Sequence, residues 1–181
     1  MRLFVAVPLD EGMRRAVYRD LEPLRQNSPG IKWVRPEVMH ITLVFLGEVP
    51  DGKLGELKRI LGGMELSGGP FDIVFRGTGR FPPKGRPRVF FSAVEEGVER
   101  LRAIHRECSG VLKPFYASGG GSSFTPHLTL GRVRRGGENT GDIDLPSDRR
   151  YSCRVDRVVL YRSILHGSGP EYFVEWEGFF T

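Results

Sequence analysis

Two short segments of the sequence place a histidine and a threonine two residues apart in a setting typical of β-strands. They are His40-Ile41-Thr42-Leu43-Val44-Phe45-Leu46-Gly47 and His127-Leu128-Thr129-Leu130-Gly131-Arg132. Side chains alternate between the two faces of a strand, so the histidine and threonine of each segment share one face. The apolar residues between them then point into a core.

A single strand histidine is more often structural than catalytic. Here, however, two of the chain's four histidines occur in matching contexts, one in each half of the sequence. A repeated local context indicates a repeated structural unit. We therefore expect the fold to bring these two strands together, with two imidazoles and two hydroxyl groups in one groove.

Two facing imidazoles suit general acid–base chemistry at phosphorus, because both titrate near neutral pH. One can take a proton from an attacking water while the other protonates the departing oxygen, and each role contributes roughly 10²–10⁴-fold in rate. Thr42 and Thr129 can donate hydrogen bonds to non-bridging phosphoryl oxygens. Arg132 would face away from Thr129 in a regular strand, and it reaches the groove only if Gly131 breaks the alternation.

Other site chemistries find less support in the sequence. Two histidines could bind zinc, but no Asp, Glu or Cys accompanies either motif at short spacing. No Gly-x-Ser-x-Gly segment marks a serine nucleophile. Cys108 and Cys153 lie far apart and form neither a zinc pattern nor a disulfide framework. We expect no metal and no cofactor.

Composition is that of an ordinary soluble globular protein. The chain has 181 residues, 39% of them hydrophobic and 27% charged, which suits one domain or two small lobes with a shared core. The net charge of +5 fits a polyanionic substrate such as RNA without requiring one. No apolar run approaches the roughly 18 residues of a membrane span, and the apolar start is too short for a signal peptide. We expect a cytoplasmic protein without membrane contact.

Hydrophobic periodicity and turn residues predict alternating strands and helices. The predicted strands cover residues 2–7, 31–34, 40–47, 71–75, 88–94, 127–132, 152–164 (one or two strands) and 172–176. The predicted helices cover residues 11–26, with Asp10 as N-cap, 53–61 and 95–112. Residues 77–88, 113–123 and 134–148 read as loops. The last of these is polar and Gly-rich, and 119–121 is a run of three glycines.

Three features admit more than one interpretation. Trp33 could stack on a base, but we favour a core position because Trp is mostly buried. His105 lies beside the apolar face of its predicted helix, and we expect it to be a surface residue. The basic loop at 77–88 is either a solvated loop or an RNA-facing rim, with its cations at Arg80, Lys84, Arg86 and Arg88.

The paired motifs resemble those of the 2H phosphoesterase superfamily, and within it the RNA 2′,3′-cyclic phosphodiesterase group, also called 2′-5′ RNA ligases. Supporting segments lie at residues 2–7, 32–37, 86–89 and 160–163, so the resemblance spans nearly the whole chain. It implies an α+β fold with two similar lobes of antiparallel sheet plus helices, related by pseudo-two-fold symmetry around a central cleft. We expect residues 1–181 to form this single bilobal domain.

The resemblance also implies metal-independent opening of a 2′,3′-cyclic phosphate at an RNA end, which leaves a 2′-phosphate. His40 and His127 would be the acid–base pair, and Thr42 and Thr129 would bind the phosphate. Arg132 resembles the basic residue that follows the family's second motif.

Two aromatic residues are further site candidates under this resemblance. Phe45 and Tyr161 would line the nucleotide pocket, although a core position for Phe45 is at least as plausible. We assign His40 to protonation of the leaving 3′-oxygen and His127 to activation of water, and the sequence is compatible with the reverse. Two departures from the family are a short, polar segment at 134–150 and Phe91, where a Trp is common.

The expected partners are RNA with 2′,3′-cyclic phosphate ends or small cyclic nucleotides. Two other functions fit the sequence. One is 2′-5′ joining of RNA ends in the same cleft, and the other is a non-catalytic RNA-binding module that uses the basic loop. Because the cleft would be complete within one chain, we expect a monomer.

Overall fold

A computed structural model describes residues 1–116, 124–134, 143, 145 and 149–181. Most of the loop predicted at 113–123, including its three glycines at 119–121, lies outside these residues. So does most of the loop predicted at 134–148. Within the described part of the chain, no helix is long and apolar enough to span a membrane.

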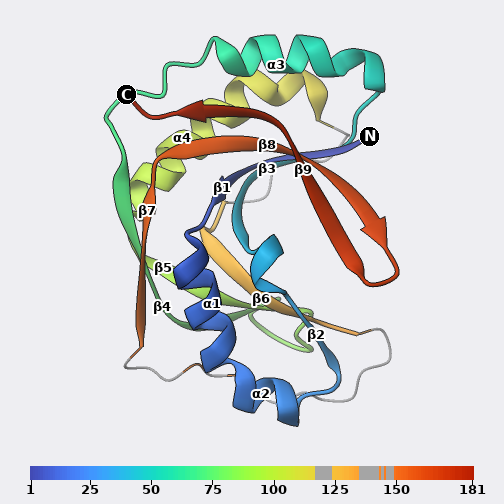
Figure 1. The fold of residues 1–181 in the computed structure, drawn as a ribbon, viewed down its shortest axis with the longest axis vertical. Helices are drawn as coiled ribbons and strands as arrows, with labels where there is room; N and C mark the ends of the chain where they lie inside the picture. The colour runs from blue at the N-terminus through green and yellow to red at the C-terminus, as the bar shows by residue number, and fades with distance from the viewer. Residues whose placement is uncertain (117–123, 135–142, 144, 146–148) are drawn as a thin grey trace.

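Two antiparallel sheets form the framework of the protein (Figure 1). The four-stranded sheet has the order β3-β1-β8-β9 and contains β1 (Arg2–Pro8), β3 (His40–Glu48), β8 (Arg157–His166) and β9 (Gly169–Phe179). The five-stranded sheet has the order β2-β6-β5-β4-β7 and contains β2 (Ile31–Trp33), β4 (Phe71–Phe81), β5 (Val89–Glu96), β6 (His127–Val133) and β7 (Arg150–Val155). The predicted α+β class with two lobes of antiparallel sheet plus helices is confirmed.

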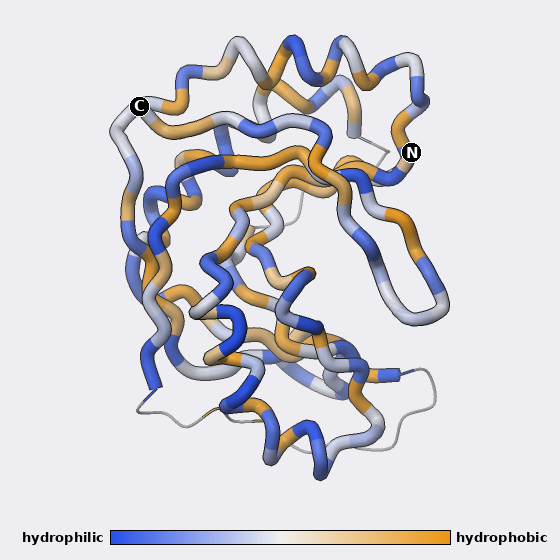
Figure 2. The backbone as a smooth tube through the Cα atoms, in the orientation of Figure 1, coloured by the Kyte–Doolittle hydropathy of each residue, from blue (hydrophilic) through white to orange (hydrophobic). Residues whose placement is uncertain are grey.

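Helices cover each sheet, as Figure 1 shows. Helices α3 (Leu54–Gly62) and α4 (Val98–Leu112) pack against β9 and β3 of the four-stranded sheet, and α1 (Glu11–Asp20) contacts β7 of the other sheet. Side chains from both sheets join one hydrophobic cluster. Figure 2 accordingly shows hydrophobic residues running along the central strands and alternating with hydrophilic residues on the outer helices. This shared core holds the two lobes together.

The helix predicted over residues 11–26 is wrong as a single element. The structure has α1, which Asp10 caps by accepting a hydrogen bond from the Met13 amide at 2.9 Å, and then a separate α2 (Glu22–Asn27). The break lies at Leu21, just before Pro23 at the start of α2. Proline has no amide hydrogen to continue the helical ladder, so a new helix begins there.

Two other boundaries also differ from the prediction. The loop predicted at 77–88 begins only after Phe81, because β4 continues its pairing with β5 past a register shift at Gly77, whose φ is 67°. The helix predicted from residue 95 begins at Val98, because Glu95 and Glu96 still belong to β5. Gly97, with φ of 83°, makes the turn between strand and helix.

Candidate active site

Strands β3 and β6 carry the two motifs, one from each sheet, and the two strands contact each other. Each strand contains a β-bulge directly after its threonine. The pairing register of β3 with β1 skips Leu43, and that of β6 with β5 skips Leu130. A bulge inserts one residue and reverses the alternation of the side chains that follow. As a result, Phe45 and Arg132 return to the face that carries the histidine and threonine.

The sequence left open whether Arg132 faces the groove or points away from it, and the bulge in β6 shows that it faces the groove. Its side chain reaches the site because Leu130 is the extra residue of β6. Gly131 contributes differently, by letting β2 approach. A Cβ atom at Gly131 would lie 2.6 Å from Cγ2 of Ile31 and 3.3 Å from Cε3 of Trp33.

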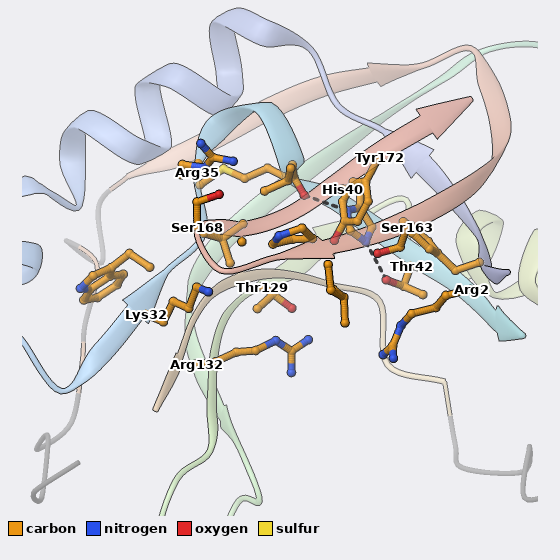
Figure 3. A pocket seen from close by; sticks show the side chains of 18 of the residues that line it. Arg2, Lys32, Arg35, His40, Thr42, Thr129, Arg132, Ser163, Ser168 and Tyr172 are labelled. Atoms are coloured by element: carbon orange, nitrogen blue, oxygen red, sulfur yellow. Dashed lines mark hydrogen bonds between the residues drawn. The ribbon is translucent and has the colours of Figure 1, made fainter. Parts of the chain in front are cut away.

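A cavity of about 510 Å³ opens between these strands and the β8–β9 hairpin (Figure 3). Five of the seven predicted site residues line it: His40, Thr42, Phe45, Thr129 and Arg132. Phe45 is 52% exposed, so the core position that the sequence also allowed is excluded. The sequence interpretation did not single out several other lining residues, among them Arg2, Lys32, Arg35, Ser163 and Tyr172. Arg2, Lys32 and Arg35 stand in the segments that carried the resemblance, which was the available signal for them.

The imidazole of His40 is held by two hydrogen bonds. Nδ1 lies 2.8 Å from the carbonyl oxygen of Val38, and Nε2 lies 2.9 Å from Oγ1 of Thr42. A carbonyl oxygen can only accept, so Nδ1 carries the hydrogen and donates it. In the neutral ring Nε2 is then the basic nitrogen, and the Thr42 hydroxyl donates to it.

His127 repeats the Nδ1 hydrogen bond of His40 in the other lobe. Its Nδ1 donates to the carbonyl oxygen of Thr125 at 2.7 Å, so the carbonyl two residues upstream fixes the same tautomer. Phe81 and Phe91 pack against the ring, each with its centroid 5.2 Å from that of His127. His127 is half-buried and is not itself among the side chains that line the cavity. Phe91, which departs from the family's common Trp, therefore supports this histidine.

Both histidines favour the neutral state. Burial lowers the pKa of His40 from 6.5 to about 4; the Val38 hydrogen bond opposes this shift, and the charges of Arg132 and His127 add to it. Burial also lowers the pKa of His127, with Thr125 opposing and Arg132 reinforcing the shift. The charge of His127 is the smallest of the effects on the pKa of His40, so the two imidazoles lie within electrostatic reach of each other.

Aromatic rings account for the burial of His40. Phe4 lies 4.9 Å and Tyr172 5.3 Å from its ring centroid. Tyr161 lies 6.5 Å from the His40 ring and 5.4 Å from Phe4, but it is not among the side chains that line the cavity. The structure therefore places Tyr161 behind the site, where it packs against the rings that surround His40.

His105 is not the surface residue that the sequence predicted. It is half-buried, and its Nδ1 lies 2.8 Å from the carbonyl oxygen of Leu43, the extra residue of the β3 bulge. Its ring stacks on Phe124 at 4.2 Å, directly before Thr125, whose carbonyl holds His127. His105 thus links α4 to both motif strands, and no local sequence pattern signals this long-range contact.

Of the other residues that the sequence singled out, Trp33 lines the cavity and the basic loop residues and the cysteines do not. Trp33 is half-buried and packs against both hydrophobic clusters, which agrees with the core position that we favoured from the sequence. Its side chain also lines the cavity. The basic residues Arg80, Lys84, Arg86 and Arg88 are not among the cavity-lining side chains. Cys108 and Cys153 are buried free thiols. Within the described ranges, no group of three or more His, Cys, Asp or Glu side chains is arranged to hold a metal ion.

The sequence of this chain is similar to a known protein family and to several named relatives. A family model described as LigT-like phosphoesterase matches residues 7–91. A relative from Archaeoglobus fulgidus named RNA 2′,3′-cyclic phosphodiesterase is 39% identical over 95% of this chain and 96% of its own length. A relative of the same name from Thermotoga maritima is 33% identical over 98% of this chain and 94% of its own length.

Solved structures share the fold. A Thermus thermophilus protein aligns with a TM-score of 0.74 and 31% identity, and the alignment covers 99% of this chain and 97% of that one. Escherichia coli LigT complexed with 3′-AMP aligns with a TM-score of 0.79 and 20% identity over 99% and 98% of the two chains, which supports the fold alone. The resemblance inferred from the paired motifs is confirmed: this chain belongs to the family of LigT-like phosphoesterases, together with relatives named RNA 2′,3′-cyclic phosphodiesterases.

Proposed function

We propose that this protein is an RNA 2′,3′-cyclic phosphodiesterase that leaves a 2′-phosphate. The carrying observation is the pair of imidazoles on equivalently bulged strands, each locked in one tautomer by the carbonyl two residues upstream. The names of relatives that match almost the whole chain support the same activity.

In the proposed reaction, Thr42, Thr129 and Arg132 hold the cyclic phosphate. Their hydroxyl and guanidinium groups donate to its non-bridging oxygens and stabilise the charge that builds there in the transition state. The Thr42 hydroxyl becomes free to do so when Nε2 of His40 gains a proton and no longer accepts from it. His127 removes a proton from water as the water oxygen bonds to phosphorus. The bond from phosphorus to the 3′-oxygen breaks, and His40 protonates that oxygen, so the phosphate remains on the 2′-oxygen.

The lowered pKa of His127 fits its role as the general base. Both imidazoles are neutral in the free enzyme at neutral pH, so the basic nitrogen is available. An anionic phosphate in the cavity favours the charged form of a nearby imidazole and raises its pKa. Substrate binding therefore recruits the proton that the acid later donates.

The apolar end of the cavity suits the nucleobase. Phe45 is exposed and has the guanidinium carbon of Arg2 4.8 Å from its ring centroid. A base can stack on such an aromatic face. Tyr161 supports this wall from behind through Phe4. We further propose that residues 1–181 act as one bilobal domain and as a monomer, because a single chain supplies both motif strands. We also propose that the protein works in the cytoplasm, where RNA substrates are present.

The test is hydrolysis of nucleoside 2′,3′-cyclic phosphates in the presence of EDTA, with identification of the product isomer. His40→Ala and His127→Ala should each lower kcat by about 10²–10⁴-fold. His166→Ala is the matched control, since His166 lies exposed on the hairpin with Glu171. Near-normal turnover in both single variants, or a 3′-phosphate product, would contradict the proposal.

A sulfur atom in place of the bridging 3′-oxygen separates the two roles. A thiolate leaves with less need for protonation, so this substrate should restore much of the rate lost in His40→Ala but not that lost in His127→Ala. The opposite pattern would reverse the assignment of acid and base.

A further inference from the structure

The cavity brings four cations together. Arg2, Lys32, Arg35 and Arg132 line it, and no Asp or Glu is found among the described lining residues. None of the four has an ion-pair partner within the described part of the chain, whereas Arg162 nearby is paired with Glu175 at 2.9 Å. Unpaired cations in a concave site concentrate positive potential there. The cavity is therefore built for more than one anionic group.

Two of these cations are direct neighbours across strands. Lys32 on β2 is the register partner of Arg132 on β6. Like charges directly opposite each other destabilise a sheet, and neighbouring strands lie only about 4.8 Å apart. An anion bound between or beside them would relieve this repulsion. Arg35 follows at the entry to the 3₁₀ turn Pro36–Val38 and extends the charge away from the motif strands.

The four cations divide between the two ends of the cavity. In Figure 3, Lys32 and Arg35 lie on one side of His40, and Arg2 lies on the other. The Arg2 end also holds the exposed ring of Phe45, whose centroid lies 4.8 Å from the guanidinium carbon of Arg2. Arg132 lies with Thr129 at the proposed position of the cyclic phosphate. Lys32 and Arg35 are thus left without an assigned ligand.

We propose that Lys32 and Arg35 form a subsite for the phosphodiester on the 5′ side of the terminal nucleoside, so that the enzyme selects RNA ends over free cyclic nucleotides. This inference rests on the function proposed above. In a ribonucleotide the base leaves the ring at C1′ and the chain continues from C4′, on opposite sides of the ring oxygen. A base on Phe45 therefore directs the 5′ phosphodiester toward the end of the cavity where Lys32 and Arg35 lie.

The experiment varies both sides of the contact. The ligands are two dinucleotides with a 2′,3′-cyclic phosphate end, one with a phosphodiester linkage and one with an uncharged methylphosphonate linkage. The wild-type protein should favour the phosphodiester by about tenfold in kcat/KM, and in Kd measured by fluorescence anisotropy, because two charge-assisted contacts are at stake. In the variant Lys32→Gln/Arg35→Gln this ratio should fall to within about twofold of unity.

The control is Arg106→Gln/Lys113→Gln, which removes the same charge at exposed positions that do not line the cavity. It should keep the wild-type ratio. The salt dependence of phosphodiester binding should weaken in the Lys32→Gln/Arg35→Gln variant, by a slope of about 0.7 for each phosphate charge that the protein no longer neutralises. These results together would support the subsite.

Two outcomes would overturn the subsite. One is a wild-type ratio near unity, and the other is a ratio that survives in Lys32→Gln/Arg35→Gln or falls equally in the control. Absence of turnover on every cyclic phosphate would defeat the proposed function instead, and the Kd ratios would still decide whether the phosphodiester is read.

Discussion

Acidification from pH 7 to pH 5 should destabilise the folded protein through His40. The packing of Phe4 and Tyr172 around this ring removes it from water, and burial lowers its pKa from 6.5 to about 4. Between these two values the unfolded chain binds a proton at residue 40 that the folded chain does not. The free energy of unfolding therefore falls as the pH decreases through this window and is restored above about pH 6.5. The two pKa values correspond to about 2 kcal/mol at pH 5.

The assay is urea denaturation of the wild-type protein and of His40→Gln at both pH values. Glutamine is neutral at either pH, so the difference between the two pH dependences isolates the contribution of His40. With a typical slope of about 2 kcal/mol per molar urea, the wild-type midpoint should fall by about 1 M more than that of His40→Gln. His166→Gln, at the exposed hairpin tip, controls for the loss of any histidine. An equal fall in the wild-type protein and His40→Gln would refute the argument that burial keeps His40 neutral.

Two further predictions follow from the same geometry. The alkaline limb of kcat should lie at higher pH than that of kcat/KM, because bound phosphate raises the histidine pKa values that burial lowers in the free enzyme; coincident limbs in steady-state pH profiles would argue against this coupling. Gly131→Ala should lower the free energy of unfolding, measured by thermal denaturation, by about 1–3 kcal/mol, because the added Cβ would lie 2.6 Å from Cγ2 of Ile31. The control Gly110→Ala, in helix α4, should stabilise the protein, because its added Cβ would meet no atom within 4 Å.

The local pattern of the sequence was sufficient for the class of fold and for the centre of the site. Alternating apolar residues marked β3 and β6, and the spacing of His40 and Thr42, repeated at His127 and Thr129, placed each pair on one face. These are short-range properties, since strand alternation and helical periodicity depend on neighbours a few residues away. The same reasoning missed the break at Leu21 and the continuation of β4 to Phe81, where proline chemistry and strand pairing outweighed the local pattern.

Only the tertiary structure decided which further residues join the site. Alternation alone would send Phe45 and Arg132 away from the threonines, and the bulges that turn them back exist only relative to the register of β1 and β5. Lys32 becomes the neighbour of Arg132 because β2 pairs with β6 across about one hundred residues of sequence. The lowered pKa of His40 likewise comes from the burial of its ring in the folded protein. Register, burial and the grouping of charges are long-range properties, so the sequence determined the reacting groups while the fold decided their surroundings.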